Sequence, residues 1–180
     1  MNQLQVATTI TENAFLLIAV LIPLAGSLVV MTLKNNPNLR EFTSFAASVL
    51  LFSVVCSFIP ALKQGHTLVY PVFQLLPGLS ITLRADGFSM IFALVASSLW
   101  MIAVFYSLGY MRAHNEPKQT RFNACFALAI FGAIGVAFSD NLLTLYLFYE
   151  IVSICTYPLV AHHQDEKSYE GARKYIIYLT

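Results

Sequence analysis

The chain is poor in charged residues. Only 11% of its 180 residues are Asp, Glu, Lys or Arg, whereas a soluble domain carries about 25%. The formal net charge of +1 provides no basic surface for a polyanion, so we do not expect nucleic-acid binding. Hydrophobic residues make up 58% of the sequence. This balance argues against a soluble globule or a disordered chain and indicates a protein of the lipid bilayer.

Motifs that hold cofactors or metals are also missing from the sequence. The three cysteines lie in apolar runs without a CxxC pair or a Cys/His cluster, which predicts buried thiols rather than a disulfide framework. There is no glycine-rich dinucleotide loop and no P-loop. The four histidines lie between the apolar runs, which disfavours paired ligation of a haem inside the membrane. We therefore expect no cofactor, no metal site and no catalytic centre in these residues.

Five apolar segments approach or exceed the roughly 20 residues that a membrane-spanning helix needs. They cover residues 14–33, 42–62, 87–111, 122–139 and 141–161. The first is followed, not preceded, by a basic residue, so it is predicted to be a retained membrane helix rather than a secretory signal. A sixth helix is expected from about residue 172. The sequence therefore predicts an all-α polytopic membrane protein with a single membrane domain.

The sixth helix and the longest connection carry further expectations. An apolar helix that stops inside lipid leaves carbonyl groups without partners. We therefore expect a truncated or split product, or the first part of a longer chain, with a tail lying at the membrane surface as the alternative. Residues 63–86 are interrupted by Pro71, Pro77 and Gly78, which predicts an extended segment or a short hairpin in an outside loop.

The distribution of basic residues predicts the orientation of the chain. The first, third and fifth connections hold eight of the ten Lys and Arg residues, and the remaining two lie on the other side. Because basic residues gather on the cytoplasmic side, the N-terminus is predicted to lie outside and the connection 162–171 inside. We expect a multi-pass protein of the inner (cytoplasmic) membrane. The eight residues are Lys34, Arg40, Arg112, Lys118, Arg121, Lys167, Arg173 and Lys174.

One acidic residue lies inside a predicted span. Glu150 follows Asn141 by nine residues, which places it roughly 14 Å into a hydrocarbon core of about 30 Å. A charge at that depth costs at least about 2.5–3.5 kcal/mol. Tyr146, Ser153 and Tyr157 share its helical face and form a polar stripe that must face protein or water. Glu150 is therefore a candidate proton-translocation residue, supported by this stripe.

A structural role for Glu150 is the alternative. A protonated Glu150 would hold neighbouring helices together through hydrogen bonds without moving an ion. No Lys or Arg lies within a predicted complete span. An ionised Glu150 would then need a counter-ion from residues beyond 180 or from another subunit.

Two histidines and one group of small residues are weaker features. His162 and His163 follow the fifth span on the predicted cytoplasmic side and are candidates for proton entry, although a solvated loop is the favoured interpretation. In the fourth span, Ala129, Gly132 and Ala133 belong to a pattern of small residues that lets two helices approach closely. We interpret this pattern as helix packing rather than as a binding site.

The segment 140–150, DNLLTLYLFYE, with Ser153 and the Tyr-Pro-Leu of 157–159, resembles the fifth helix of the antiporter-like membrane proteins. These are the large membrane subunits of respiratory complex I, the related hydrogenase subunits and the Mrp-type cation/proton antiporter subunits. The segments 84–89 and 106–111 resemble the two ends of the third helix in that family. The stretch 156–162 resembles the D-type branch of the Mrp subunits most. The resemblance is specific over about residues 84–178.

The resemblance implies a fold and a function. The family fold has about fourteen helices with two inverted repeats, and this chain corresponds to its N-terminal portion. The family's fifth-helix glutamate, matched by Glu150, pairs with a lysine on a later helix, and shifts of this ion pair are proposed to gate proton movement. The residue before that glutamate is usually Trp in the family and is Tyr149 here.

The function expected on this basis is proton translocation within a cation/proton antiporter or a respiratory complex. The expected partners are other membrane subunits and the lipid bilayer, and the ion is the proton, with sodium as an alternative. In an NADH:quinone oxidoreductase-like complex the chain would be a non-redox subunit. The alternative function is a structural membrane fragment or split subunit that scaffolds partner helices without transport of its own.

Overall fold

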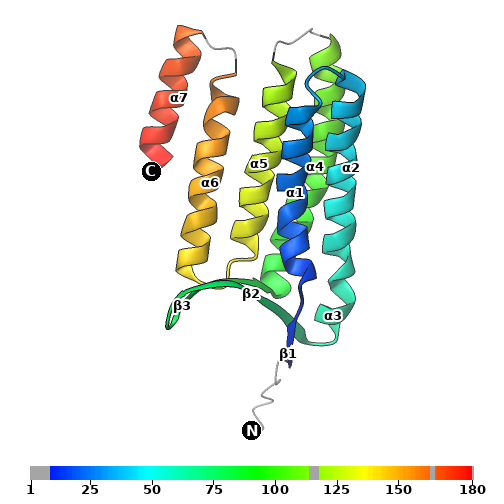
Figure 1. Cartoon of the computed structure of the whole chain (residues 1–180), viewed down its shortest axis with the longest axis vertical. Coiled ribbons are helices and arrows are strands. Elements are labelled where there is room, and N and C mark those ends of the chain that lie inside the picture. The colour runs from blue at the N-terminus through cyan, green and yellow to red at the C-terminus, as the bar shows by residue number, and fades with distance from the viewer. Residues whose placement is uncertain (1–8, 114–117, 163–164, 180) are drawn as a thin grey trace.

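The computed structural model describes residues 9–113, 118–162 and 165–179. Long helices run alternately up and down and form a bundle, and a small sheet lies across one end of it (Figure 1). The helices are α1 (Phe15–Thr32), α2 (Pro37–Ser57), α3 (Ile59–Lys63), α4 (Gly87–Ala113), α5 (Gln119–Ala137), α6 (Leu142–Val160) and α7 (Glu166–Leu179). The strands are β1 (Thr9–Glu12), β2 (His66–Leu76) and β3 (Leu79–Ala85).

Five segments of the described chain are long and apolar enough to cross a membrane: α1, α2 with α3, α4, α5 and α6. Their outer faces carry large apolar side chains, such as Phe88 and Phe105 on α4, which are 84% and 72% exposed. In water such exposure would be costly, but against lipid tails it is not. The structure therefore confirms a mostly helical, polytopic membrane fold with five spanning helices.

The helix bounds differ from the predicted spans at several places, and two of these differences have a clear local cause. The second predicted span, 42–62, is interrupted at Phe58, where α2 ends and the short α3 begins. Pro60 in the first turn of α3 lacks the amide that a continuous helix would need. The sixth predicted span corresponds to α7, which begins at Glu166 rather than near residue 172. The Asp165 carboxylate accepts a hydrogen bond from the Ser168 amide at 2.8 Å and caps this helix start.

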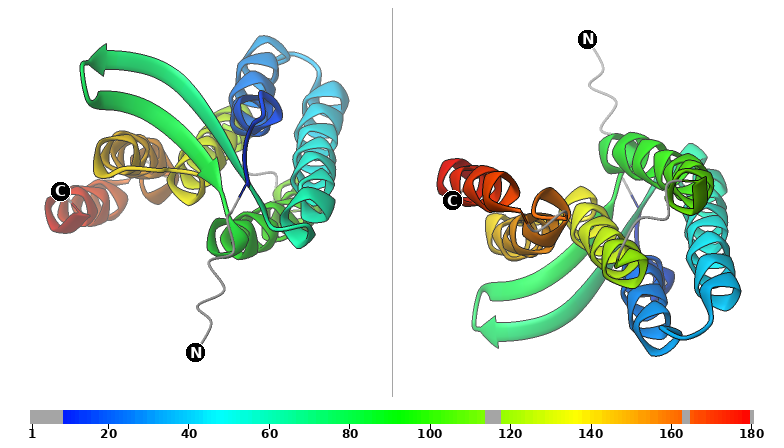
Figure 2. Two further views of the ribbon diagram at one scale, coloured as in Figure 1. Left: turned by 90° about the horizontal axis from the view of Figure 1, so that it is seen from below. Right: turned by 90° about the horizontal axis from the view of Figure 1, so that it is seen from above.

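The connection between α3 and α4 forms an antiparallel hairpin of β2 and β3. Its turn follows Pro77, and Gly78 adopts a positive φ of 87°, a conformation that glycine reaches without steric cost. The short strand β1 adds to β2 in parallel, which the sequence analysis did not predict. The sheet lies across the end of the bundle where α1 and α6 begin, and the tip of the hairpin extends beyond the helices on one side (Figure 2).

Hydrogen bonds tie the hairpin to the connection between α5 and α6. The Asp140 amide donates to the Thr82 carbonyl at 3.1 Å, and the Asn141 side-chain amide donates to the Ser80 carbonyl at 2.8 Å. The same Asn141 side chain accepts from the Thr144 amide at 2.9 Å and so caps the start of α6. Strand β3 therefore fixes the position from which α6 enters the membrane.

Candidate functional site

Glu150 lies close to the middle of α6, which runs from Leu142 to Val160. At 1.5 Å per residue it lies about 12 Å from the first helical residue. Its side chain is partly exposed, and the Tyr146 side chain one turn earlier on the same face is close enough to interact with it electrostatically. Glu150 makes no ion pair with Lys or Arg in the described ranges. The helix thus carries one acidic group at mid-length, close to a phenol on the same helix.

The predicted polar stripe on α6 has an uneven environment. Tyr146 is 58% exposed, whereas Ser153 is 1% exposed. The Ser153 hydroxyl donates to the Tyr149 carbonyl at 3.2 Å, so its single donor is used within the helix. Tyr157 is partly buried. The four stripe residues therefore do not form one continuous chain of hydrogen bonds, and Tyr146 and Glu150 are the two that interact.

Neighbouring helices pack on other faces of α6. Phe148 and Val152 face α5, where they lie against its glycines. On another side, the Tyr149 hydroxyl donates to the Leu179 carbonyl of α7 at 2.9 Å, and Thr156 shares a 2.9 Å hydrogen bond with Tyr175. Glu150 belongs to neither set of contacts. The face of α6 that carries it is therefore not covered by α5 or α7.

A groove of about 520 Å³ adjoins Glu150. It is bounded by α1, the hairpin, α5 and α6, and Glu150 is the charged group among the described residues that line it. Leu17 of α1 and Phe148 of α6 contribute to its apolar wall. Glu150 therefore places one acidic group at the edge of an otherwise apolar groove, where a charge is costly.

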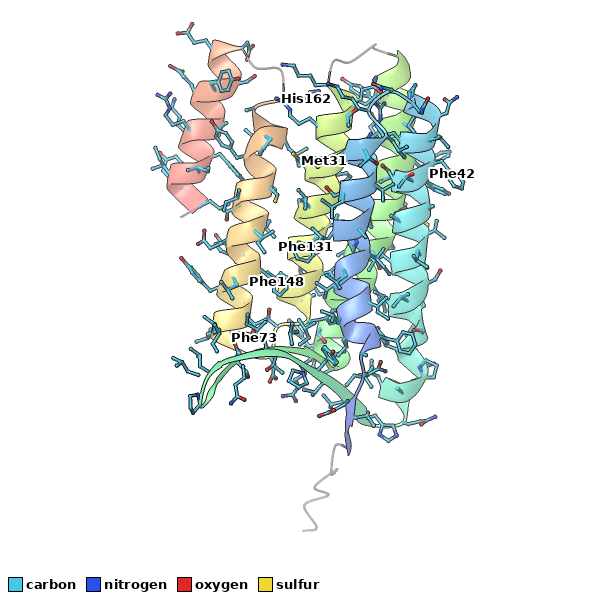
Figure 3. The ribbon with its side chains drawn as sticks, in the orientation of Figure 1. Met31, Phe42, Phe73, Phe131, Phe148 and His162 are labelled. Carbon is cyan, nitrogen blue, oxygen red and sulfur yellow. The ribbon has the colours of Figure 1, made fainter. Side chains whose placement is uncertain are left out.

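His162 lies at the opposite end of α6 from the sheet (Figure 3). Its carbonyl accepts a hydrogen bond from the Arg121 guanidinium at 2.9 Å, and its ring lies edge-on to Phe122 with centroids 5.6 Å apart. It is twelve residues from Glu150 along the sequence, roughly 18 Å at the helical rise. The structure thus does not bring His162 into contact with Glu150. His163, the other predicted entry residue, lies outside the described residues.

One of the predicted packing residues, Gly132, lies at the contact between α5 and α6. Ala129 and Gly132 are buried and Ala133 is partly buried. A Cβ atom on Gly132 would lie only 2.6 Å from Cγ2 of Val152 and 3.1 Å from the Phe148 carbonyl oxygen. Absence of a side chain at Gly132 therefore permits the close approach of the two helices. The same contact is lined by an edge-to-face pair of Phe131 and Phe148 with centroids 5.5 Å apart (Figure 3).

The sequence analysis missed a buried polar cluster at the end of the bundle away from the sheet. Arg40 is only 6% exposed, and its guanidinium donates to the side chains of Thr120 at 3.0 Å and Gln119 at 2.7 Å. Arg40 lies before the predicted span 42–62, but α2 begins at Pro37 and so includes it. The cluster joins α2 to the start of α5. In the sequence, only the position of Arg40 next to a predicted helix start could have indicated that it joins two helices.

The described residues hold no group of three or more His, Cys, Asp or Glu side chains that could bind a metal ion. The ion pairs at the sheet end join Arg84 to Asp140 at 3.5 Å and to Asp86 at 3.9 Å, with the Arg84 side chain 47% exposed. Exposed pairs of this kind contribute little stability. They reinforce the link between the hairpin and the α5–α6 connection rather than form a reactive centre.

Two family models match this chain. Residues 77–123 match the model described as NADH-ubiquinone oxidoreductase (complex I), chain 5 N-terminus. Residues 139–180 match the model described as NADH:quinone oxidoreductase/Mrp antiporter, transmembrane. The second match includes all of α6, and therefore Glu150.

Curated relatives extend the similarity over most of the chain. The A1 subunit of a Na(+)/H(+) antiporter of Staphylococcus haemolyticus is 31% identical over 166 residues, which is 89% of this chain and 20% of that protein. The A/B subunit of a probable K(+)/H(+) antiporter of Rhizobium meliloti is 31% identical over 159 residues, covering 86% of this chain and 16% of the relative. The chain thus spans about a fifth or less of the length of these relatives. Both relatives carry A-type names, and the resemblance to the D-type branch stays a prediction.

Two solved structures share the fold. One is the membrane-bound sulfane sulfur reductase, an archaeal respiratory membrane complex, with a TM-score of 0.80 and 20% identity; the match covers 92% of this chain and 34% of that chain. The other is the Mrp complex from a Dietzia species, with a TM-score of 0.68 and 22% identity, covering 82% of this chain and 27% of that chain. Both structures are of membrane complexes, and these matches show that the fold of this chain occurs in them.

Proposed function

This chain belongs to the antiporter-like family of membrane subunits, and we propose that it forms part of a proton-translocating unit in a cation/proton antiporter or a respiratory complex. The observation that carries the proposal is the carboxyl group of Glu150, halfway along a membrane-spanning helix and free of ion pairs in the described chain. An acidic group in a spanning helix is costly and is a functional candidate for that reason.

Glu150 fits a proton carrier on three grounds. It lies at mid-length of α6, so a proton that reaches it has crossed about half of the hydrocarbon core. It adjoins an apolar groove, where water screens the interaction between two charges less than it does in solution. Its face of α6 is open to a further element, and Tyr146 supplies a hydroxyl that can pass a proton along the helix. Its counter-ion would come from residues beyond the described ranges or from another subunit.

Orientation, location and partners belong to the same proposal. The basic end of the bundle, with Lys34 and Arg121, would face the cytoplasm by the positive-inside rule. The sheet and the N-terminus would then lie outside, and the chain would be a multi-pass protein of the inner membrane. The structural relatives are parts of membrane complexes, which supports other membrane subunits as partners. The names of the sequence relatives support protons exchanged for Na⁺ or K⁺.

The test replaces Glu150 by Gln, which keeps the size and hydrogen-bonding groups but cannot ionise. Inverted vesicles from cells that carry the chain in its own assembly are energised, and proton exchange on cation addition is followed with a pH-sensitive dye. Because a group that transfers protons contributes about 10²-fold or more, we expect Glu150→Gln to reduce exchange by at least about tenfold. Glu170→Gln is the matched control, since Glu170 is an exposed residue of α7 outside the five spans.

Assembly is measured in parallel by native gel electrophoresis of the solubilised vesicles. Normal exchange by a correctly assembled Glu150→Gln variant would remove Glu150 from the mechanism. That outcome would favour the structural alternative, in which the chain scaffolds partner helices. The close packing of α5 on α6 at Gly132 supports that alternative, which predicts sensitivity at Gly132 and tolerance at Glu150.

A further inference from the structure

A second groove lies between the last turn of α1 and the first turns of α5, at the end of the bundle away from the sheet. It encloses about 390 Å³. Figure 3 shows Met31 near this end of α1, toward the same end of the bundle as His162. The groove shares no lining residue with the groove beside Glu150. It is therefore a separate site with no part in the proton pathway proposed above.

Three basic side chains line the groove: Lys34 from the end of α1, and Lys118 and Arg121 from the start of α5. No carboxylate is among the described residues that line it. The ion pairs of the described chain involve other basic residues, Arg40 and Arg84. Arg121 is held in place because its guanidinium donates to the His162 carbonyl at 2.9 Å. Three positive charges thus converge on one cavity without a compensating acid from its walls.

The start of α5 adds to the attraction for an anion. Its first turn contains no acidic residue, and no side chain caps its free amides. Amides at a helix start carry a partial positive charge and bind anions such as phosphate. α5 is 19 residues long, so this effect is fully developed. The uncapped helix start and the basic side chains therefore act at the same place.

Apart from Thr120, the remaining wall of the groove is apolar. Cys125 and Leu128 follow Arg121 by one and two helical turns on the same face of α5, and Met31 of α1 lies opposite them. The groove therefore has charged groups at the level of the helix ends and apolar groups on the side that continues into the membrane. A free phosphate would use only the first part, whereas a phospholipid would use both.

We propose that this groove binds an anionic phospholipid, with the phosphate between Lys34, Lys118 and Arg121 and an acyl chain along Met31, Cys125 and Leu128. Basic pockets between membrane helices are the physical basis for binding acidic headgroups. A zwitterionic lipid carries no net charge and gains little from the three cations. The bound lipid would bridge α1 and α5, which are already linked beside the groove by the Ser27 hydroxyl donating to the Ala124 carbonyl at 3.0 Å.

The experiment measures lipid binding by the purified 180-residue chain in neutral detergent, using native mass spectrometry and a titration with phosphatidylglycerol. The test variant carries Lys34→Gln, Lys118→Gln and Arg121→Gln. The control variant carries Lys63→Gln, Arg173→Gln and Lys174→Gln, which removes the same charge outside the groove. Each basic residue near an acidic headgroup contributes roughly fivefold in affinity, so the test variant should bind roughly 100-fold more weakly at the additive limit.

A second variant protects the test against misfolding. Lys34→Gln with Lys118→Gln leaves the Arg121–His162 contact intact and should bind roughly 25-fold more weakly than the unchanged chain. Site-specific occupancy is read from Cys125 in a Cys56→Ser, Cys155→Ser background, because Cys125 lines the groove. Phosphatidylglycerol should slow its alkylation at least threefold, and neither phosphatidylcholine nor glycerol phosphate should do so.

Three results would overturn the proposal. Equal phosphatidylglycerol affinity of test and control variants would show that the three cations do not form the site. Equal binding of phosphatidylcholine would remove the role of charge. Protection of Cys125 by glycerol phosphate alone would indicate a site for a free phosphate ester instead of a lipid. None of these outcomes depends on Glu150, so this proposal and the proposed function fail separately.

Discussion

The contact between α5 and α6 offers a quantitative prediction at Gly132. A Cβ there would lie 2.6 Å from Cγ2 of Val152, 3.0 Å from the Val152 amide nitrogen and 3.1 Å from the Phe148 carbonyl oxygen. The valine methyl can rotate, but the two backbone atoms cannot move unless the helices separate by a few tenths of an ångström. Overpacking of this kind costs about 1–3 kcal/mol. Gly132→Ala is therefore expected to be less stable by that amount than a glycine-to-alanine substitution in a helix without such a contact.

A matched control separates this contact from the general effect of replacing glycine. Gly109 lies in α4 and has nothing within 4 Å of its Cβ position. Both substitutions gain the same helix preference of about 1 kcal/mol, so the difference between them isolates the contact. Unfolding in micelles by titration with a denaturing detergent can be followed through Trp100, the single tryptophan, which is 1% exposed. If Gly132→Ala proves as stable as Gly109→Ala, the close α5–α6 packing described above is wrong.

Two further substitutions probe the polar contacts by the same titration. Asn141→Ala removes the cap on the Thr144 amide and the bond to strand β3, so we expect a loss of about 1–2 kcal/mol; no change would mean that the hairpin does not position α6. Arg40→Met keeps the bulk of the side chain but leaves the side-chain amide oxygen of Gln119 without its donor. We expect this to lower the free energy of unfolding by about 1–3 kcal/mol. Because Arg40 is 6% exposed, that loss should persist in high salt; a loss that salt abolishes would indicate a solvated residue.

The spanning helices were predictable because lipid imposes a simple rule on the sequence. A helix that crosses the membrane satisfies its own backbone, so hydropathy and length alone identify it. Residue type also acts locally at two helix starts: Asn141 caps α6, and the Asp86 carboxylate accepts from the Ser89 amide at 2.9 Å. Local signals therefore predicted the elements whose stability is local.

Contacts between distant segments could not be read from the sequence in the same way. Strand β1 has four residues, and its partners begin at His66. The pairing of Arg40 with Gln119 joins residues 79 positions apart. Lys34 and Lys118 meet in one groove because the end of α1 lies beside the start of α5. Such sites depend on the topology of the bundle, which composition and periodicity do not specify.

Glu150 itself was predicted from its cost in lipid, and the structure places it at mid-length of α6, beside a groove. The stripe predicted around it was less informative. Shared helical spacing places Ser153 on the same face, but its hydroxyl bonds to the Tyr149 carbonyl of its own helix. Spacing identifies a face, whereas hydrogen-bond partners depend on rotamers and neighbours that spacing does not determine.

The central claim is that Glu150 acts as an ionisable carboxyl group rather than as a hydrogen-bonding link. The most direct measurement compares proton exchange in energised vesicles for the unchanged chain, Glu150→Asp and Glu150→Gln at equal levels of assembly. The account predicts that Asp retains measurable exchange, since the carboxyl group is kept one methylene shorter, and that Gln loses it. Equal exchange by Gln and the unchanged chain would contradict the account.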